Sequence, residues 1–227
     1  MEYKRFLCVK AVALSLLLVV IFSVTSCRIK KHQPDYNGID EFVAYITSNS
    51  DVEIQYWYTD LINKDYQTAN IAIYIGEQVP LSKIDSVRVA ANDFLNNNPD
   101  YFLNDYCICI TVKNRIDKPG FAYARFANIE RITIPALSEG GYPKYDSLCA
   151  VEAFVSEEDL DYLAGLDDIV SLRIHPFNLN DETFMLECLS AVRSMNGLND
   201  VYVADEWYDC FNDSDIECIV HSWLWTE

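Results

Sequence analysis

Hydrophobic and polar positions recur with helix and strand periods from residue 39 onward. Apolar residues three and four apart predict a helix over 39–49, ended by an Asn-Ser pair. Strict alternation then predicts strands over 52–58 and 71–75. The polar stretch 63–65 lies between them. We therefore expect these two strands to form a hairpin.

The middle of the chain repeats this order of helix and hairpin. A single apolar stripe over 81–95 predicts a helix, with Pro80 suited to its start and 96–99 (NNNP) to its end. Alternation over 106–112 predicts a strand, and 121–126 is its expected hairpin partner after a Lys-Pro-Gly turn.

The C-terminal hundred residues alternate between strand and helix patterns. Ser156 opens a helix with an acidic first turn that stops at Gly165. Ser214 and Glu217 predict a capped last helix with an apolar stripe ending at Trp223. The remaining elements are strands over 132–134, 149–155, 169–174 and 201–203, and a long helix over 180–195.

These patterns predict an α+β fold with a mixed sheet, divided into a subdomain with hairpins over 39–127 and an alternating subdomain over 128–227. Three segments share an apolar pattern that resembles the strand core of leucine-rich repeats, and residues 84–92 match its longer form. The intervals are unequal, and most exceed the roughly 20–29 residues of that family. We interpret them as parallel strands with helical crossovers, with an irregular solenoid as the alternative. The three segments begin at Ile129, Ile169 and Leu198.

Composition excludes a disordered chain and argues against nucleic-acid binding. Hydrophobic residues make up 51% and aromatic residues 13% of the sequence, enough for a packed core. The formal net charge of −18 repels nucleic acid and anionic lipid heads and favours cations and basic partners. The same acidity also serves solubility on an exported domain.

The N-terminus has the layout of an export signal. Lys4, Arg5 and Lys10 precede the uncharged run 11–26, which is shorter than the roughly 20 residues of a spanning helix. The run ends in Val24-Thr25-Ser26-Cys27. This sequence resembles a bacterial lipobox, which implies diacylglycerol on the Cys27 sulfur and cleavage before it.

On this interpretation residues 1–26 are a signal peptide and 27–38 a polar tether. The chain would then be lipid-anchored to the cell membrane and face outside the cytoplasm. The alternative is an uncleaved signal anchor, which the basic residues Arg28, Lys30 and Lys31 would flank. Both interpretations place most of the chain outside the cytoplasm.

Six cysteines remain once Cys8 is lost with the signal and Cys27 carries lipid, and an even number in an exported chain allows disulfides. Cys210 and Cys218 are the pair expected to reach each other, if their Cα atoms come within about 7 Å. Buried free thiols are the alternative. No cysteine spacing matches a zinc site, and we expect no metal or other cofactor.

No catalytic motif is present in the sequence. The nucleophile elbow G-x-S-x-G is absent. The acidic run 205–217 superficially suggests calcium but lacks the central glycine of an EF-hand loop. Trp57 and Trp225 each face away from the apolar stripe of their element and are candidate binding aromatics. We expect a tethered module that binds a protein or glycan, with an extracytoplasmic glycan hydrolase as the alternative.

Overall fold

A computed structural model describes residues 38–223 apart from 64–67, 102–105, 115–121 and 130–143. The predicted strand over 132–134, the signal segment with Cys27, and Trp225 therefore lie outside the described residues. No helix in the described part of the chain is long and apolar enough to cross a membrane.

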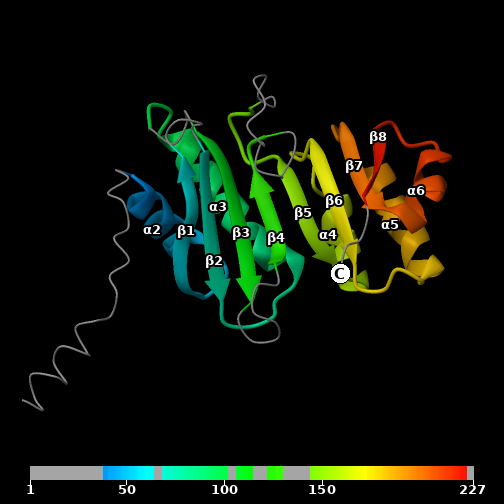
Figure 1. Cartoon of the computed structure of the whole chain (residues 1–227), viewed down its shortest axis with the longest axis horizontal. Coiled ribbons are helices and arrows are strands. Elements are labelled where there is room, and N and C mark those ends of the chain that lie inside the picture. The colour runs from blue at the N-terminus through cyan, green and yellow to red at the C-terminus, as the bar shows by residue number, and fades with distance from the viewer. Residues whose placement is uncertain (1–37, 64–67, 102–105, 115–121, 130–143, 224–227) are drawn as a thin grey trace, which may run out of the picture. The chain divides into compact units, whose positions relative to one another are not determined.

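The described residues form an eight-stranded sheet with helices, so the predicted α+β fold is confirmed (Figure 1). The strands are β1 (Ile54–Asn63), β2 (Thr68–Ile75), β3 (Cys107–Asn114), β4 (Ala122–Ala127), β5 (Ala150–Val155), β6 (Ser171–Pro176), β7 (Asp200–Ala204) and β8 (Ile219–Trp223). The helices are α2 (Ile39–Asn49), α3 (Leu81–Asn97), α4 (Leu160–Ala164), α5 (Glu182–Ser194) and α6 (Asp205–Asn212), with the short 3-10 helix η2 (Glu157–Asp159) before α4.

Each strand lies beside its neighbours in sequence, in the order β1 to β8. The hairpins β1–β2 and β3–β4 are antiparallel, as predicted, and β4 also pairs antiparallel with β5. The pairs β2–β3, β5–β6, β6–β7 and β7–β8 are parallel. Each parallel step needs a crossover, and the helices α3 to α6 supply these connections. β4 and β5 join the two predicted subdomains into one sheet.

The core lies between the sheet and the layer formed by α3, α4 and α5, which is behind the sheet in Figure 1. Alternate strand residues such as Ile73, Ile110, Val151 and Leu172 are fully buried because they point into this layer. Helix α2 packs on α3 through Phe42 and Phe94, whose rings meet edge to face at 5.3 Å. The described helices thus cover one face of the sheet.

A buried charge network joins α3 to the elements around α4. The Arg88 guanidinium donates two hydrogen bonds to Asp85, at 2.6 and 2.8 Å, and a third to Asp168 at 2.6 Å. Tyr162 donates its hydroxyl to Asp85 at 2.8 Å. Burial alone would lower the pKa of Arg88, but these hydrogen bonds and the two negative charges raise it above its ordinary value. Arg88 is therefore charged although it is only 1% exposed.

The predicted last helix is wrong. Residues 219–223 form β8, which pairs in parallel with β7, and the helix lies earlier as α6. Trp207 and Phe211 are four residues apart on α6 and both are buried, which fixes its inward face. Ser214 donates to the Phe211 carbonyl at 2.6 Å, so it closes α6 instead of opening a helix.

The repeat pattern has two structural outcomes. The segments that begin at Ile169 and Leu198 fall on β6 and β7, which are parallel neighbours joined by α5, as we interpreted them. The longest match, 84–92, lies in α3 and not on a strand. The antiparallel pairs β3–β4 and β4–β5 also interrupt any regular repeat. We therefore describe the architecture as a mixed α+β sheet and not as a solenoid.

Candidate functional site

The face of the sheet opposite the helices carries aromatic and charged side chains in rows. Residues paired in register across neighbouring strands point to the same face. Arg125 pairs with Glu152, Glu152 with Arg173, Arg173 with Tyr202, and Tyr202 with His221. Among the described elements no helix covers this face, which we call the open face. One row therefore carries three charged side chains on β4 to β6 and two rings on β7 and β8.

A carboxylate and a histidine meet on the open face between β5 and β6. His175 Nε2 lies 2.6 Å from Glu152 Oε1, and both side chains are 11% exposed. The histidine ring stacks on Phe154, its register partner, at 4.8 Å with 22° between the planes. The Trp223 ring lies 4.4 Å from the same imidazole, measured between centroids. The imidazole is thus held by one hydrogen bond and two rings.

The same arrangement occurs again between β7 and β8. His221 Nε2 lies 2.6 Å from Asp200 Oδ1, and its ring stacks on Tyr202 at 4.5 Å and 15°. In both places an acid and an aromatic residue stand two apart on one strand, and the histidine is in register with the aromatic on the next parallel strand. Parallel pairing reproduces the geometry because register and pleat are the same in both pairs.

Glu152 is an ionised group that is almost buried. Burial by itself raises the pKa of a carboxyl. The hydrogen bond to His175 and the positive charges of Arg125, His175 and Arg173 outweigh that effect and lower the pKa of Glu152 below its ordinary value. Arg125 reaches the second oxygen at 3.2 Å, and its side chain is 41% exposed. Glu152 therefore holds neighbouring basic groups in place as an acceptor.

Arg173 is a half-buried basic group of the open face that acts on Glu152 through its charge but forms no hydrogen bond to it. Its guanidinium lies over the Tyr202 ring, 5.1 Å from the centroid. Within the described part of the chain it makes no hydrogen bond or ion pair. A guanidinium presents a planar fork of donors that matches a carboxylate. Arg173 can therefore receive an oxyanion while its plane is held by Tyr202.

Two adjoining cavities open at the carboxyl ends of the parallel strands β5 and β6. Their volumes are about 350 and 460 Å³, and Gln78, Glu158 and Phe177 line both. Ligands of open α/β sheets commonly bind at this end of parallel strands. The exposed ring of Phe177 meets Phe154 at 5.6 Å, which connects the cavities to the open face.

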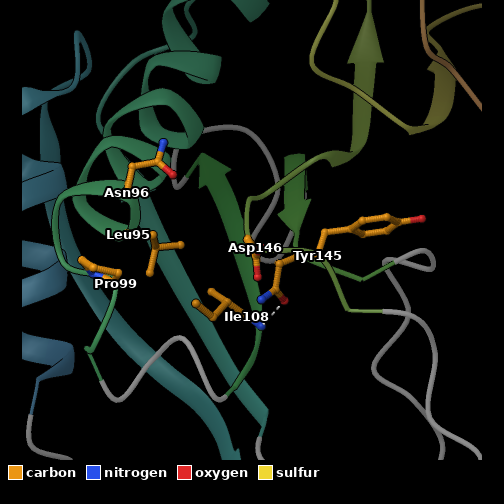
Figure 2. A pocket seen from close by; sticks show the side chains of 7 residues that line it. Leu95, Asn96, Pro99, Ile108, Tyr145 and Asp146 are labelled. Atoms are coloured by element: carbon orange, nitrogen blue, oxygen red, sulfur yellow. Dashed lines mark hydrogen bonds between the residues drawn. The ribbon is translucent and has the colours of Figure 1, made fainter.

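A third cavity, of about 340 Å³, lies between the end of α3 and the start of β3 (Figure 2). Asn128 is one of the polar residues that line it, and its side chain accepts from the Ile108 backbone N–H at 2.7 Å and donates to the Tyr106 carbonyl at 3.0 Å. Figure 2 shows the Tyr145 ring directed away from Leu95 and Ile108. The Asn128 side chain therefore stabilises the start of β3, and we assign this cavity a structural role.

Trp57, which the sequence indicated as a binding aromatic, lies in a different position from the one expected. Trp57 is half-buried and in register with Ile73, so it lies on the helix-covered face and not on an exposed one. Its neighbours Tyr56 and Tyr58 occupy the open face beside Tyr74. Trp57 is therefore less exposed than expected, and its role as a binding aromatic stays a prediction.

Cys210 on α6 and Cys218 before β8 are both free thiols in the structure. Their disulfide stays a prediction, which peptide mapping of protein made in an oxidising compartment would test. Among the described residues, no group of three or more His, Cys, Asp or Glu side chains is placed to hold a metal ion. The start of the acidic run 205–217 forms the exposed first turn of α6.

The sequence interpretation missed the paired histidines and carboxylates of the open face. A signal was present, because Glu152-Ala-Phe154 and Asp200-Val-Tyr202 share the pattern acid, apolar, aromatic on two predicted strands. The comparisons with known protein families, curated proteins and solved structures gave no match to this chain. We therefore infer the function from the geometry of the site.

Proposed function

We propose that this chain is a binding module, held by lipid on Cys27 at a membrane surface outside the cytoplasm, that contacts a partner protein through its open face. The observation that carries the proposal is the position of Arg173, a guanidinium fixed over Tyr202 with no hydrogen-bonded partner within the described residues. A partner segment that carries a carboxylate would complete this site by a charge-assisted, bidentate hydrogen bond.

The composition of the open face supports a protein partner. Tyrosine, tryptophan and arginine dominate the energetics of protein interfaces: the two aromatics bury large areas at low entropic cost, and arginine forms several hydrogen bonds at once. The open face presents Tyr56, Tyr202, Trp223, Arg125 and Arg173 on the rigid strands of one sheet. Such residues need little reordering on binding, which preserves affinity.

The charge distribution supports an acidic segment in that partner. The chain as a whole is strongly acidic, with a formal net charge of −18. Lys113, Arg125 and Arg173 nevertheless lie on the open face, where Lys113 stands over the rings of Tyr58 and Tyr74. An acidic segment is repelled by most of the surface and attracted here, so electrostatics fix where it binds.

The glycan-hydrolase alternative has less support from the same residues. A glycosidase needs a carboxylic acid that stays protonated, with a raised pKa, and a second carboxylate. The pKa of Glu152 is lowered, because its bond to His175 and the nearby arginines outweigh burial. Asp200 is bonded to His221 at 2.6 Å. These carboxylates act as acceptors that position histidines.

Capture from the native envelope by residues 28–227 tests the binding proposal. Residues 38–227 form one compact unit, which makes this fragment suitable. We expect one partner to bind wild type and Arg193→Ala, a matched control on the exposed side of α5. Arg173→Ala and Arg173→Lys should weaken that binding roughly tenfold or more, since lysine keeps the charge but not the fork. Equal capture by all four proteins would contradict the proposal.

The lipid anchor needs a separate test. Labelled palmitate should enter the wild-type protein and not Cys27→Ala, because the thiol is the attachment point. If cleavage depends on the modified cysteine, the variant should also retain residues 1–26, which a measurement of the intact mass would detect. Equal labelling of the two proteins, or no labelling of either, would exclude this anchor.

A further inference from the structure

The two adjoining cavities at the carboxyl ends of β5 and β6 combine an exposed ring with polar groups. Phe177 is 56% exposed, although a phenylalanine gains free energy when it is buried. It follows Pro176, the last residue of β6, and lines both cavities. Gln78 and Glu158 line both cavities with it, and Asn178 lines the larger one. Exposed aromatic area at the mouth of a cavity is a signal for a ligand.

The polar groups around Phe177 include both donors and acceptors of hydrogen bonds. Gln78 and Asn178 each supply an amide with both functions, and the Glu158 carboxylate accepts. All three residues are exposed, so they are accessible to a ligand. The nearby Asp181 is different, since it caps α5 by accepting from the Phe184 backbone at 3.0 Å. A ligand rich in hydroxyl groups would satisfy the hydrogen-bonding groups of Gln78, Asn178 and Glu158.

We propose that this site binds a neutral saccharide, with one sugar ring packed on Phe177. A sugar ring has a face of C–H groups that packs on an aromatic ring, and hydroxyls at its edge that hydrogen-bond amides and carboxylates. Phe177 supplies the aromatic ring, and the cavities also present the amides and the carboxylate. The site is separate from Arg173, so it does not depend on the partner proposed for the open face.

Charge and ring geometry favour a neutral saccharide over an acidic sugar and over a cation of the choline type. Glu157, Glu158 and Asp181 all line the larger cavity, which disfavours an acidic sugar. A cation of the choline type is held by several ring faces arranged as a cage. Of the three rings that line the cavities, Phe154 is stacked on His175 and Phe184 is buried, so Phe177 is the one exposed to a ligand. One open ring with amides beside it fits a neutral sugar better than a cation.

Ligand-observed saturation-transfer NMR on the 28–227 fragment tests the proposal. The probes are the methyl glycosides of glucose, galactose, mannose and N-acetylglucosamine, with glucuronate and choline for comparison. We expect at least one neutral glycoside to bind. Phe177→Ala should weaken it about tenfold or more, and Phe177→Trp should retain it. Leu186→Ala is the matched control, because Leu186 on α5 is also 56% exposed and should leave binding unchanged.

Glu158→Gln separates a sugar from a cation. The amide still hydrogen-bonds a hydroxyl, so a neutral glycoside should keep its affinity within about threefold, whereas a cation would lose its charge partner. The melting temperature of each variant checks that folding is intact. No binding by any neutral glycoside, binding of choline or glucuronate alone, or equal loss in Phe177→Ala and Leu186→Ala would overturn the proposal. None of these results bears on Arg173, which the envelope capture tests.

Discussion

The Asp159 carboxylate accepts a hydrogen bond from the backbone N–H of Leu81 at 2.8 Å, across 78 residues of sequence. Leu81 is the first residue of α3, and Pro80 before it supplies no side-chain cap. The other oxygen of Asp159 accepts from the Ser156 backbone and hydroxyl, at 3.0 and 2.6 Å, in the capping box of η2. One side chain thus caps two helices and ties α3 to the second half of the sheet.

Replacement of Asp159 should therefore cost more than loss of a single surface cap. We expect Asp159→Ala to lower the free energy of unfolding by about 2 kcal/mol, the upper part of the range for capping residues, since both oxygens lose buried donors. Urea denaturation measures the change. Asp161→Ala, an exposed acid on α4, is the control and should change stability by less than about 0.5 kcal/mol.

The Arg88 network predicts a difference between single and double substitution. Arg88→Ala leaves Asp85 buried without its cation and should cost about 3–5 kcal/mol. The double variant Asp85→Asn with Arg88→Met removes both charges, so it should be markedly more stable than Arg88→Ala. Equilibrium unfolding of Asp85→Asn, Arg88→Met and the double variant gives the coupling energy. Additive effects of the two positions would show that the pair is not coupled as the geometry implies.

Stability should fall in acid through Glu152. Its folded-state pKa lies below the ordinary 4.5, because the bond to His175 and the positive charges around it outweigh burial. A lowered pKa contributes stability that is fully present above pH 4.5 and is lost as the pH falls through the folded-state value. Glu152→Gln should remove this contribution. The stability difference between wild type and the variant should therefore shrink from pH 6 to pH 3.

A constant difference across that range would contradict the lowered pKa. Glu157→Gln is the control, since Glu157 is exposed next to the same sheet end and should leave the pH dependence of wild type nearly unchanged. Chemical denaturation at each pH supplies both curves.

Thiol reactivity should separate the cysteines by burial. Burial raises the pKa of Cys149 to about 11 and that of Cys188 to about 12, so almost no thiolate is present at neutral pH. Both side chains are also inaccessible, at 3% and 0% exposure. In the reduced native protein we expect iodoacetamide to modify Cys210 well before either of them. Mass spectrometry of a time course measures the order, and equal rates would indicate that the core opens readily.

Local patterns were enough for most elements, and the reason is visible in α3. Its apolar stripe and the residues at its ends all lie within one segment, and the structure has the helix at Leu81–Asn97. The same holds for the Ser156 capping box, which needs only four consecutive residues. The hairpin β1–β2 also formed as expected, since alternation and a nearby turn specify it.

The last element shows where local pattern was ambiguous. Ile216, Ile219, Val220 and Trp223 have helical spacing, while Ile219, His221 and Trp223 also alternate as a strand would. A five-residue segment satisfies both periods, and the free edge of β7 decided between them by pairing with β8. Trp57 is a similar case, because register with Ile73 placed it on the covered face.

By itself the sequence determined the class of fold, most helices and strands before residue 205, and the acidic character of the chain, since these depend on neighbouring residues or on composition. Only the tertiary structure decided which side chains meet. Glu152 and His175 are 23 residues apart, and Asp200 and His221 are 21 apart. Each pair exists because parallel register places an acid diagonally across from a histidine on the next strand. Arg173 faces outward over Tyr202 for the same reason, since hydrogen bonds between strands fix alignments that periodicity along one strand does not contain.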